Sequence, residues 1–378
     1  MFNKFLIGLL IVILSYIGWV LWGNPKPDLS HLPNHDVKIV TVTGGLEYPW
    51  GMDFLPNGDI LLSEREGRLR IIRRGVLDPR PIDGLPDNIY VAGQGGLLDV
   101  AVHPAFEHNQ RVYFSYAGSG EGGAGTEVAY GRLNGQRLED VTVIFRVFPK
   151  NAGEHHYGSR LLFDRDGYLY ITLGDRYHGL NQAQDLSDHL GSIIRLHDDG
   201  RVPEDNPFVG QAGKKPEIYA YGVRNSQGIA LRPSNGAVWY HEHGPKGGDE
   251  VNILAKGANY GWPAITYGID YSGIPITDKT EAPGMEQPVV YWNPSIAPSG
   301  MAFYSGDAFS AWQGDLFVGA LAHRHLRRLK LEGDEVVEQS VLLVDLDARI
   351  RDVTSGPDGY LYVLVDSHEG QLLRLEPK

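Results

Sequence analysis

One turn pattern recurs six times along this chain, and it limits the possible folds more than any other feature of the sequence. In each copy an apolar residue precedes a turn built from Pro, Asp, Asn or Gly, and a run with alternating apolar residues follows. Such a pattern predicts two antiparallel strands joined by a short turn. The six copies are residues 54–64, 103–116, 163–175, 231–241, 309–320 and 355–366.

The spacing of the copies indicates how the hairpins are assembled. Six copies after residue 36 give about 57 residues for each, which suits one four-stranded propeller blade with its loops. Unrelated hairpins in a β-sandwich are the alternative, but one shared turn pattern favours a propeller. The 48 glycines and 23 prolines also favour a loop-rich β fold, because both residues are unfavourable inside helices. We therefore predict an all-β, six-bladed propeller, closed by an early strand at residues 37–42 that pairs with the last blade.

Charge and cysteine content exclude several classes of function. The net charge is −13 and no run of basic residues occurs, which argues against nucleic-acid binding. The chain has no cysteine, so disulfides, thiolate nucleophiles, thiolate-bound zinc and iron–sulfur clusters are excluded. Any bound metal must be held by oxygen or imidazole ligands.

An uncharged apolar segment, residues 5–22, follows Lys4 near the N-terminus. It approaches the ~20 residues that span a bilayer, has no small-residue cleavage site, and ends with Trp19 and Trp22 at the position of an interfacial aromatic belt. We expect a hydrophobic helix within residues 1–24 that anchors a periplasmic protein in the inner membrane; a cleaved signal peptide stays open. Proline-rich residues 25–35 predict a linker, and residues 36–378 a single propeller domain.

Polar loops between the predicted hairpins hold the candidate chemistry. Residues 153–160 contain His155 and His156, which could supply a general base, although exposed histidine pairs are often plain surface. Arg224 and Asn225 stand side by side in a turn, where they could bind carboxylates or serve a structural role.

Two further loops point to ion binding. Residues 242–252 combine a Gly-Pro turn with Glu250 and other oxygen donors, which suits Ca²⁺ with its 6–8 oxygen ligands, although acidic loops are often simply solvated. Arg349 and Arg351 are two residues apart, so on a strand both would point to one face. There they would need an anion or a carboxylate, unless they lie on a solvated edge.

The ordered set of loops resembles the soluble quinoprotein glucose dehydrogenases, most closely their aldose sugar dehydrogenase branch. The likeness covers nearly everything after residue 36. It implies a six-bladed propeller that oxidises aldose sugars at C1 to the lactone, with pyrroloquinoline quinone (PQQ) and Ca²⁺ as cofactors. The matching stretches are residues 49–56, 93–104, 156–160, 221–228, 243–245, 259–263, 295–299 and 349–352.

The resemblance also implies roles for individual residues. His156 would be the general base that takes the proton from the C1 hydroxyl, and Arg224 would stabilise charge on the quinone oxygen. The positions implied to bind PQQ are Gln94, Arg224, Asn225, Ser295, Arg349 and Arg351. The positions implied to bind Ca²⁺ are the carbonyls of Gly244 and Pro245 at the cofactor, and Glu250, Tyr260 and Asp270 at a second, structural site.

Two positions depart from the family pattern. Ala322 occupies the place of a lysine that many relatives direct at the cofactor. His155 replaces an acidic residue that orients the base in the glucose-specific branch, so His156 would be less firmly oriented or would be oriented through another neighbour. The preferred aldose, the electron acceptor and the choice between monomer and homodimer stay open. Two other functions also stay open: a non-catalytic binding propeller, and a Ca²⁺-dependent lactonase with several carboxylates or amides converging on the central pore.

Overall fold

The computed structural model describes residues 28–378. The chain divides into a short N-terminal unit, Met1–Pro33, and a large unit, Asn34–Lys378. The predicted hydrophobic helix at residues 5–22, and with it the expected membrane anchor, lies outside the described residues. Among the helices of residues 28–378, none has the length and apolar character needed to span a membrane.

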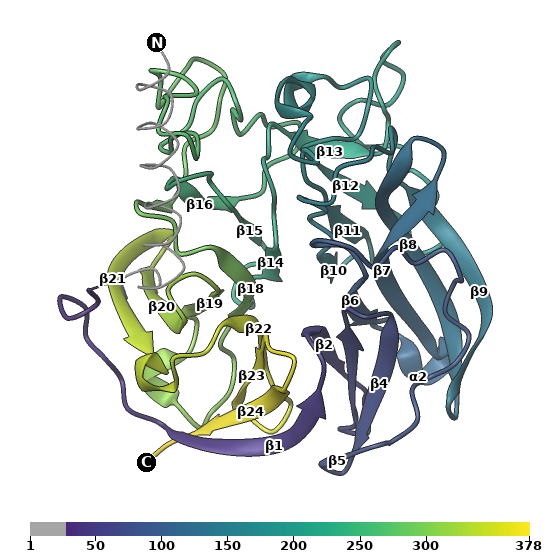
Figure 1. Ribbon diagram of the computed structural model, residues 1–378, viewed down its shortest axis with the longest axis vertical. Helices are drawn as coiled ribbons and strands as arrows, with labels where there is room; N and C mark the ends of the chain where they lie inside the picture. The colour runs from purple at the N-terminus through teal and green to yellow at the C-terminus, as the bar shows by residue number, and fades with distance from the viewer. Residues whose placement is uncertain (1–27) are drawn as a thin grey trace, which may run out of the picture. The chain divides into compact units, whose positions relative to one another are not determined.

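The large unit consists of six four-stranded antiparallel sheets around a central axis, which confirms the predicted all-β, six-bladed propeller (Figure 1). The first three sheets contain β2 (Pro49–Phe54), β3 (Ile60–Glu64), β4 (Arg68–Arg73) and β5 (Val76–Leu77); β6 (Leu97–Val102), β7 (Arg111–Gly120), β8 (Gly123–Asn134) and β9 (Arg137–Arg146); and β10 (Leu161–Phe163), β11 (Leu169–Thr172), β12 (Ser192–Leu196) and β13 (Ile218–Tyr221).

The other three sheets follow the same order, except that the sixth includes a strand from the start of the large unit. They contain β14 (Gly228–Leu231), β15 (Val238–Glu242), β16 (Asp249–Ile253) and β17 (Val290–Trp292); β18 (Pro298–Phe303), β19 (Leu316–Ala320), β20 (His325–Glu332) and β21 (Glu335–Leu342); and β22 (Ile350–Ser355), β23 (Leu361–Val365), β24 (Gly370–Glu376) and β1 (Lys38–Leu46). Short helical turns lie in the connections: α2 (Phe106–Asn109), η1 (Leu180–Gln184), η2 (Ser310–Trp312) and η3 (Val344–Leu346).

Each of the six predicted hairpin turns lies between the first and second strands of its sheet. The first strands of neighbouring sheets contact one another in a closed ring around the axis. The repeated turn pattern therefore marks the innermost hairpin of every blade. The opposite end of the ring, where the first strands begin and the second strands end, carries the polar loops that hold the candidate site.

The ring is closed by strands from the two ends of the large unit. β1 pairs antiparallel with β24, from Lys38 opposite Glu376 to Leu46 opposite Gly370. In Figure 1 these are the purple and yellow strands that lie together near the C-terminus. This pairing confirms the predicted role of residues 37–42.

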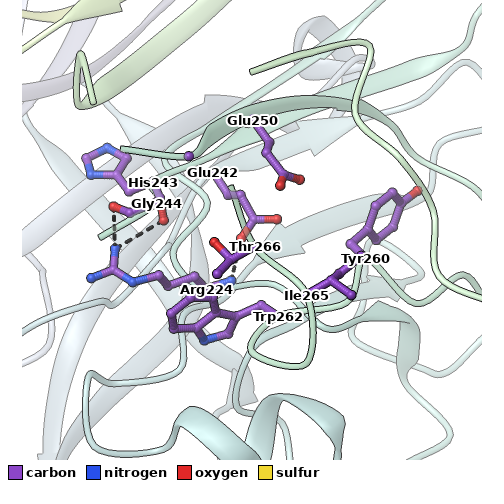
Figure 2. A pocket seen from close by; sticks show the side chains of 10 residues that line it. Arg224, Glu242, His243, Gly244, Glu250, Tyr260, Trp262, Ile265 and Thr266 are labelled. Atoms are coloured by element: carbon purple, nitrogen blue, oxygen red, sulfur yellow. Dashed lines mark hydrogen bonds between the residues drawn. The ribbon is translucent and has the colours of Figure 1, made fainter. Parts of the chain in front are cut away.

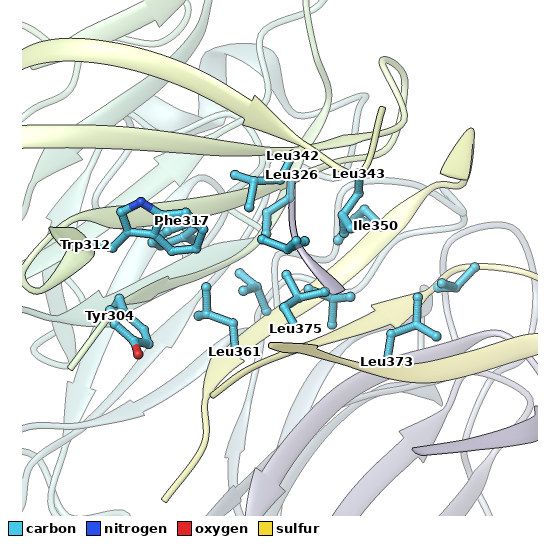
Figure 3. Close-up of a cluster of buried hydrophobic side chains, with 14 residues drawn as sticks. Tyr304, Trp312, Phe317, Leu326, Leu342, Leu343, Ile350, Leu361, Leu373 and Leu375 are labelled. Carbon is cyan, nitrogen blue, oxygen red and sulfur yellow. The ribbon is translucent and has the colours of Figure 1, made fainter. Parts of the chain in front are cut away.

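Neighbouring sheets pack face to face through apolar side chains. In β23, Val363 and Val365 belong to the core between the fifth and sixth sheets, whereas Leu364 belongs to the core between the sixth and first sheets. Figure 3 shows side chains of both sheets, such as Phe317 and Leu361, in the first of these cores. Because successive side chains point to opposite faces, a strand buried on both faces is apolar at nearly every position.

An ion triad lies among the innermost strands. Arg160 Nη1 is 3.1 Å from Asp99 Oδ1 and 3.0 Å from Asp352 Oδ1, and all three side chains are buried. A Cβ atom at Gly51 would lie 2.3 Å from Asp99 Oδ1, and one at Gly300 would lie 1.8 Å from Asp352 Oδ1. Glycine at these two positions therefore leaves room for the carboxylates. A cavity of about 300 Å³ lies on the hairpin-turn side of the triad.

Candidate active site

The loop between β9 and β10 holds His156, whose side chain is buried beside the candidate site. Its Nδ1–H donates to Asp175 Oδ1 at 2.6 Å, and its backbone N–H donates to Gln94 Oε1 at 2.8 Å. Nε2 has no hydrogen-bond partner within residues 28–378. The ring is thus held through one nitrogen while the other can accept a proton from a ligand.

The surroundings of His156 keep it neutral. Burial lowers the pKa of His156 from its ordinary value of 6.5; the hydrogen bond to Asp175 opposes this, and the charge of Arg224 lowers the pKa further. Burial alone would raise the pKa of Asp175, but its hydrogen bond and attraction to His156, with a contribution from Arg224, lower it overall. At neutral pH the pair is therefore a neutral imidazole held by a carboxylate, which is the state that a general base requires.

Asp175 connects three parts of the site. It lies just after β11 and is the last residue of the third repeat copy. Besides His156, its carboxylate accepts the backbone N–H of Tyr177 and Nε1–H of Trp262, each at 2.8 Å. The sequence hypothesis left open whether a neighbour other than the exposed His155 orients His156, and it did not identify Asp175. The structure assigns that position to Asp175.

Arg224 and Asn225 lie in the loop between β13 and β14, and both are buried. Arg224 Nη1 donates to the carbonyl oxygens of His243 at 3.1 Å and Gly244 at 2.9 Å. Asn225 Oδ1 accepts the N–H of Gly158 at 3.1 Å, while its Nδ2 is buried with no hydrogen-bond partner in residues 28–378. Buried polar groups are almost always hydrogen-bonded, so this amide is a donor available to a ligand.

Arg349 and Arg351 share one carboxylate at the start of β22. Each donates to Asp366 Oδ2 at 2.9 Å, and Arg351 Nη1 also donates to Gln227 Oε1 at 2.9 Å. Arg351 Nε is buried and has no partner within the described residues. A carboxylate, one of the partners that the sequence hypothesis allowed, is thus present, but two cations on one anion leave a net positive charge. Asp366, like Asp175, was not identified from the sequence.

Ser295 and Ala322 lie in loops that meet near the same end of the ring. Ser295 Oγ donates to Asp249 Oδ1 at 2.8 Å, and the same carboxylate oxygen accepts the N–H of Gly244 at 2.9 Å. Ala322 is exposed, and its N–H donates to the carbonyl oxygen of Ile296 at 3.0 Å. The position of the missing lysine is therefore next to the loop of Ser295.

A small buried cavity lies beside Arg224 (Figure 2). Its volume of about 10 Å³ suits one water molecule or one ion. Glu242 and Glu250, opposite each other in the β15–β16 pair, both line it. Glu242 Oε1 has no hydrogen-bond partner in residues 28–378. Burial raises the pKa of Glu250 to about 7, and burial together with the charge of Glu250 raises that of Glu242.

Only part of the predicted structural Ca²⁺ site comes together in this cavity. Tyr260 and Glu250 line it, but Asp270 does not; its carboxylate instead accepts the N–H of Ser272 at 2.8 Å. Glu242, which the sequence hypothesis omitted, lines the cavity instead of Asp270. Two buried carboxylates with a cavity of this size suit a hard divalent cation, because such a cation offsets their repulsion and their desolvation.

The predicted cofactor-side Ca²⁺ ligands are the carbonyl groups of Gly244 and Pro245. Both residues are buried, and the Gly244 carbonyl accepts the hydrogen bond from Arg224. Residues 28–378 contain no group of three or more His, Asp or Glu side chains arranged to hold a metal. A Ca²⁺ ion would therefore need backbone carbonyls, and at this position cofactor oxygens, among its ligands.

Comparisons with known proteins place the chain in a family. A family model described as glucose/sorbosone dehydrogenase matches residues 46–374. Aldose sugar dehydrogenase YliI from Escherichia coli (strain K12) is 46% identical over 377 residues, covering 97% of this chain and 98% of the relative. The crystal structure of the soluble aldose sugar dehydrogenase from Escherichia coli in the apo-form has a TM-score of 0.88 at 45% identity, covering 91% of this chain and 100% of that chain.

A third relative is a structure of the PQQ-bound form of aldose sugar dehydrogenase from Streptomyces coelicolor. It has a TM-score of 0.75 at 26% identity, covering 91% of this chain and 99% of that chain. With a family model that matches most of the propeller and a relative of such high coverage, the chain belongs to the glucose/sorbosone dehydrogenase family, in its aldose sugar dehydrogenase branch.

Proposed function

We propose that this protein oxidises aldose sugars at C1 to the lactone, using PQQ and Ca²⁺. The observation that carries the proposal is the buried pair His156–Asp175, in which a neutral imidazole presents a free Nε2 beside Arg224. The PQQ-bound structure of the Streptomyces coelicolor relative supports the choice of cofactor.

The residues of the site suit a planar tricarboxylate such as PQQ. Arg349 and Arg351 have one carboxylate between them, so they retain positive charge for an anion. Arg351 Nε and Asn225 Nδ2 are buried donors without partners in the described chain. Hydrogen bonds from arginine to carboxylates are strong and directional. Local positive charge of this kind allows a chain with a net charge of −13 to bind an anion.

The mechanism follows from the roles that these residues can perform. PQQ, when bound, supplies the acceptor for the hydride that leaves C1. His156 takes the proton of the C1 hydroxyl at Nε2, and Asp175 stabilises the imidazolium that forms. Arg224 supplies positive charge where negative charge develops during the reaction.

Ca²⁺ would be held in two places. At the cofactor, the backbone carbonyls of Gly244 and Pro245 would bind it. The ion would act as a Lewis acid that polarises the quinone carbonyl of PQQ. At the second site, Glu242 and Glu250 would bind it together with the carbonyl of Tyr260. A lactonase is less well supported, because Asp99 and Asp352, the two carboxylates of the ion triad, are already paired with Arg160.

The test is reconstitution of the purified protein with PQQ and Ca²⁺, followed by dye reduction with a panel of aldoses. We expect oxidation only with both cofactors, and poor activation by Mg²⁺, which demands a near-octahedral set of ligands. His156→Ala should lower kcat by ~10²–10⁴-fold, the contribution of a general base, with unchanged affinity for PQQ. His155→Ala, which changes the exposed neighbour of His156, should lower kcat much less.

Two outcomes would contradict the proposal. Wild-type protein that binds no PQQ, or that binds PQQ and oxidises no aldose, would favour the non-catalytic propeller. A His156→Ala variant with the turnover of the wild type would show that His156 is not the base.

A further inference from the structure

An exposed tyrosine stands next to the proposed base. The ring centroid of Tyr177 is 5.4 Å from that of His156 and 5.7 Å from that of His155. Tyr177 is 40% exposed, whereas His156 is 5% exposed. The tyrosine ring therefore forms part of the accessible rim beside the buried imidazole.

The turn that presents Tyr177 has a costly backbone conformation. Arg176 and Tyr177 have φ values of 58° and 67°, in the left-handed region that disfavours residues with side chains. The turn is held by the hydrogen bond from the Tyr177 N–H to Asp175, and by the buried Arg176, which donates to the carbonyls of His155 and Gly153. Strain of this kind persists where the surroundings enforce it, and it is concentrated at ligand-binding sites.

Neither the backbone conformation nor a hydrogen bond of the hydroxyl explains a tyrosine at this position. A glycine would adopt the same φ without strain. The side chain is exposed, and its hydroxyl makes no hydrogen bond within residues 28–378. The carboxylate that fixes this turn is the same one that holds His156, so the backbone of Tyr177 and the base have a common anchor.

We propose that Tyr177 is a specificity-determining residue that packs against the ring of the sugar substrate. The aromatic face would contact the C–H face of a pyranose while the C1 hydroxyl lies at His156 Nε2. Rigid aromatic side chains suit this contact, because they bury much apolar area and lose little conformational freedom. This inference rests on the proposed function, and it adds the side chain that selects among aldoses.

The experiment measures kcat and KM for glucose and galactose with the PQQ- and Ca²⁺-loaded enzyme. These sugars differ only at C4, so a contact with the ring can distinguish them while the reaction at C1 stays the same. Tyr177→Ala should raise KM about tenfold with little change in kcat, because the lost contact exists in both the ground state and the transition state. It should also change the ratio of kcat/KM for glucose to kcat/KM for galactose by about threefold or more.

Two variants serve as controls. Tyr177→Phe keeps the aromatic face and should retain both KM and the ratio. Tyr291→Ala removes another exposed tyrosine, 46% exposed on the outermost strand β17, and should also retain both. A PQQ titration of Tyr177→Ala should give the wild-type affinity, which places the defect at the sugar.

The outcomes separate this inference from the proposed function. An active wild type with unchanged KM and ratio in Tyr177→Ala would overturn the inference alone. Tyr177→Phe with the same loss as Tyr177→Ala would also overturn it, because the hydroxyl rather than the ring face would then matter. A wild type that oxidises no aldose would overturn both.

Discussion

Replacing Asp175 with asparagine would show how far the activity depends on the orientation of His156. The aspartate accepts hydrogen bonds from His156, Tyr177 and Trp262, using both carboxylate oxygens. Asparagine has a single acceptor oxygen, so it cannot keep all three contacts. If its NH₂ group faces His156 Nδ1, the imidazole must carry its proton on Nε2, and it can no longer accept one from the sugar.

The size of the effect follows from that change of tautomer. In a Ser-His-Asp triad the same substitution lowers kcat by about 10⁴-fold, and a general base contributes ~10²–10⁴-fold. We expect Asp175→Asn to lower kcat by about 10²–10⁴-fold. The loss of one hydrogen bond to a charged group costs about 1.5–3 kcal/mol of stability, which leaves the protein folded.

The pH dependence provides a second measurement. In the wild type, burial lowers the pKa of His156, so kcat/KM should stay constant down to a pH below 6.5 and fall where the histidine becomes protonated. Asp175 acts to raise that pKa. Asp175→Asn should therefore shift the acid limb to lower pH, although the plateau is also lower.

The assay is dye reduction with saturating PQQ and Ca²⁺ across the acid range, together with thermal denaturation. Asp53→Asn is a matched control: Asp53 is a carboxylate that accepts the N–H groups of Val102 and Phe54, each at 2.7 Å, and it lines the cavity on the far side of the ion triad. It should cost stability without lowering kcat. Wild-type kcat in Asp175→Asn, or an acid limb shifted to higher pH, would refute the reasoning.

Two further substitutions test the cation cavity and the cofactor-binding arginines. Burial raises the pKa of Glu250 to about 7, so the stability that its protonated form contributes is lost as the pH rises from about 4.5 to about 7. Without Ca²⁺, Glu250→Gln should therefore gain Tm relative to the wild type over this range, and added Ca²⁺ should raise the Tm of the wild type only; equal stabilisation of both proteins by Ca²⁺ would be evidence against the site. Arg351→Ala should weaken PQQ binding about 10- to 150-fold, the equivalent of ~1.5–3 kcal/mol for a hydrogen bond with a charged group. In the same titration Arg374→Ala, whose arginine pairs with Glu376 on β24, should keep the wild-type affinity, and an unchanged affinity in Arg351→Ala would contradict its role.

The ring of six blades could be predicted because its signal is local. Each innermost hairpin is specified by turn residues at fixed positions, and these residues act through their own backbone preferences. The closing strand at residues 37–42 could be assigned because it precedes the first copy and needs a partner. Likewise, two histidines and three arginines of the site stand in loops with recognisable motifs.

The partners of those residues could not be predicted, since they come from other loops and other strands. Asp175 and Asp366 each end a repeat copy, just after the second strand of their blade. Glu64 ends the first copy in the same way, and it pairs with Arg68 and Arg70. An acidic residue at this position was the available signal. Its role depends on which cationic side chain a neighbouring loop brings close to it, and this partner can be identified only once the fold is known.

Glu242 shows a different limit of the sequence. It is the last residue of β15, and it meets Glu250 only because the two strands pair in one particular register. A shift of one residue would turn either side chain to the other face of the sheet. Register is fixed by the packing of the whole blade, so this pair could not be assigned from the composition of its loop.

The pairing of β1 with β24 has a consequence for how the protein is made. Five of the six sheets consist of consecutive strands, so each can assemble as soon as its own segment has been synthesised. The sixth cannot, because β1 precedes the other strands of the ring in the sequence and its partner β24 follows all of them. Until β24 has been made, β1 has no partner strand and its edge is unpaired. Unpaired strand edges are templates for aggregation. Synthesis of β24, rather than the formation of any one blade, therefore sets the earliest moment at which the ring can become continuous.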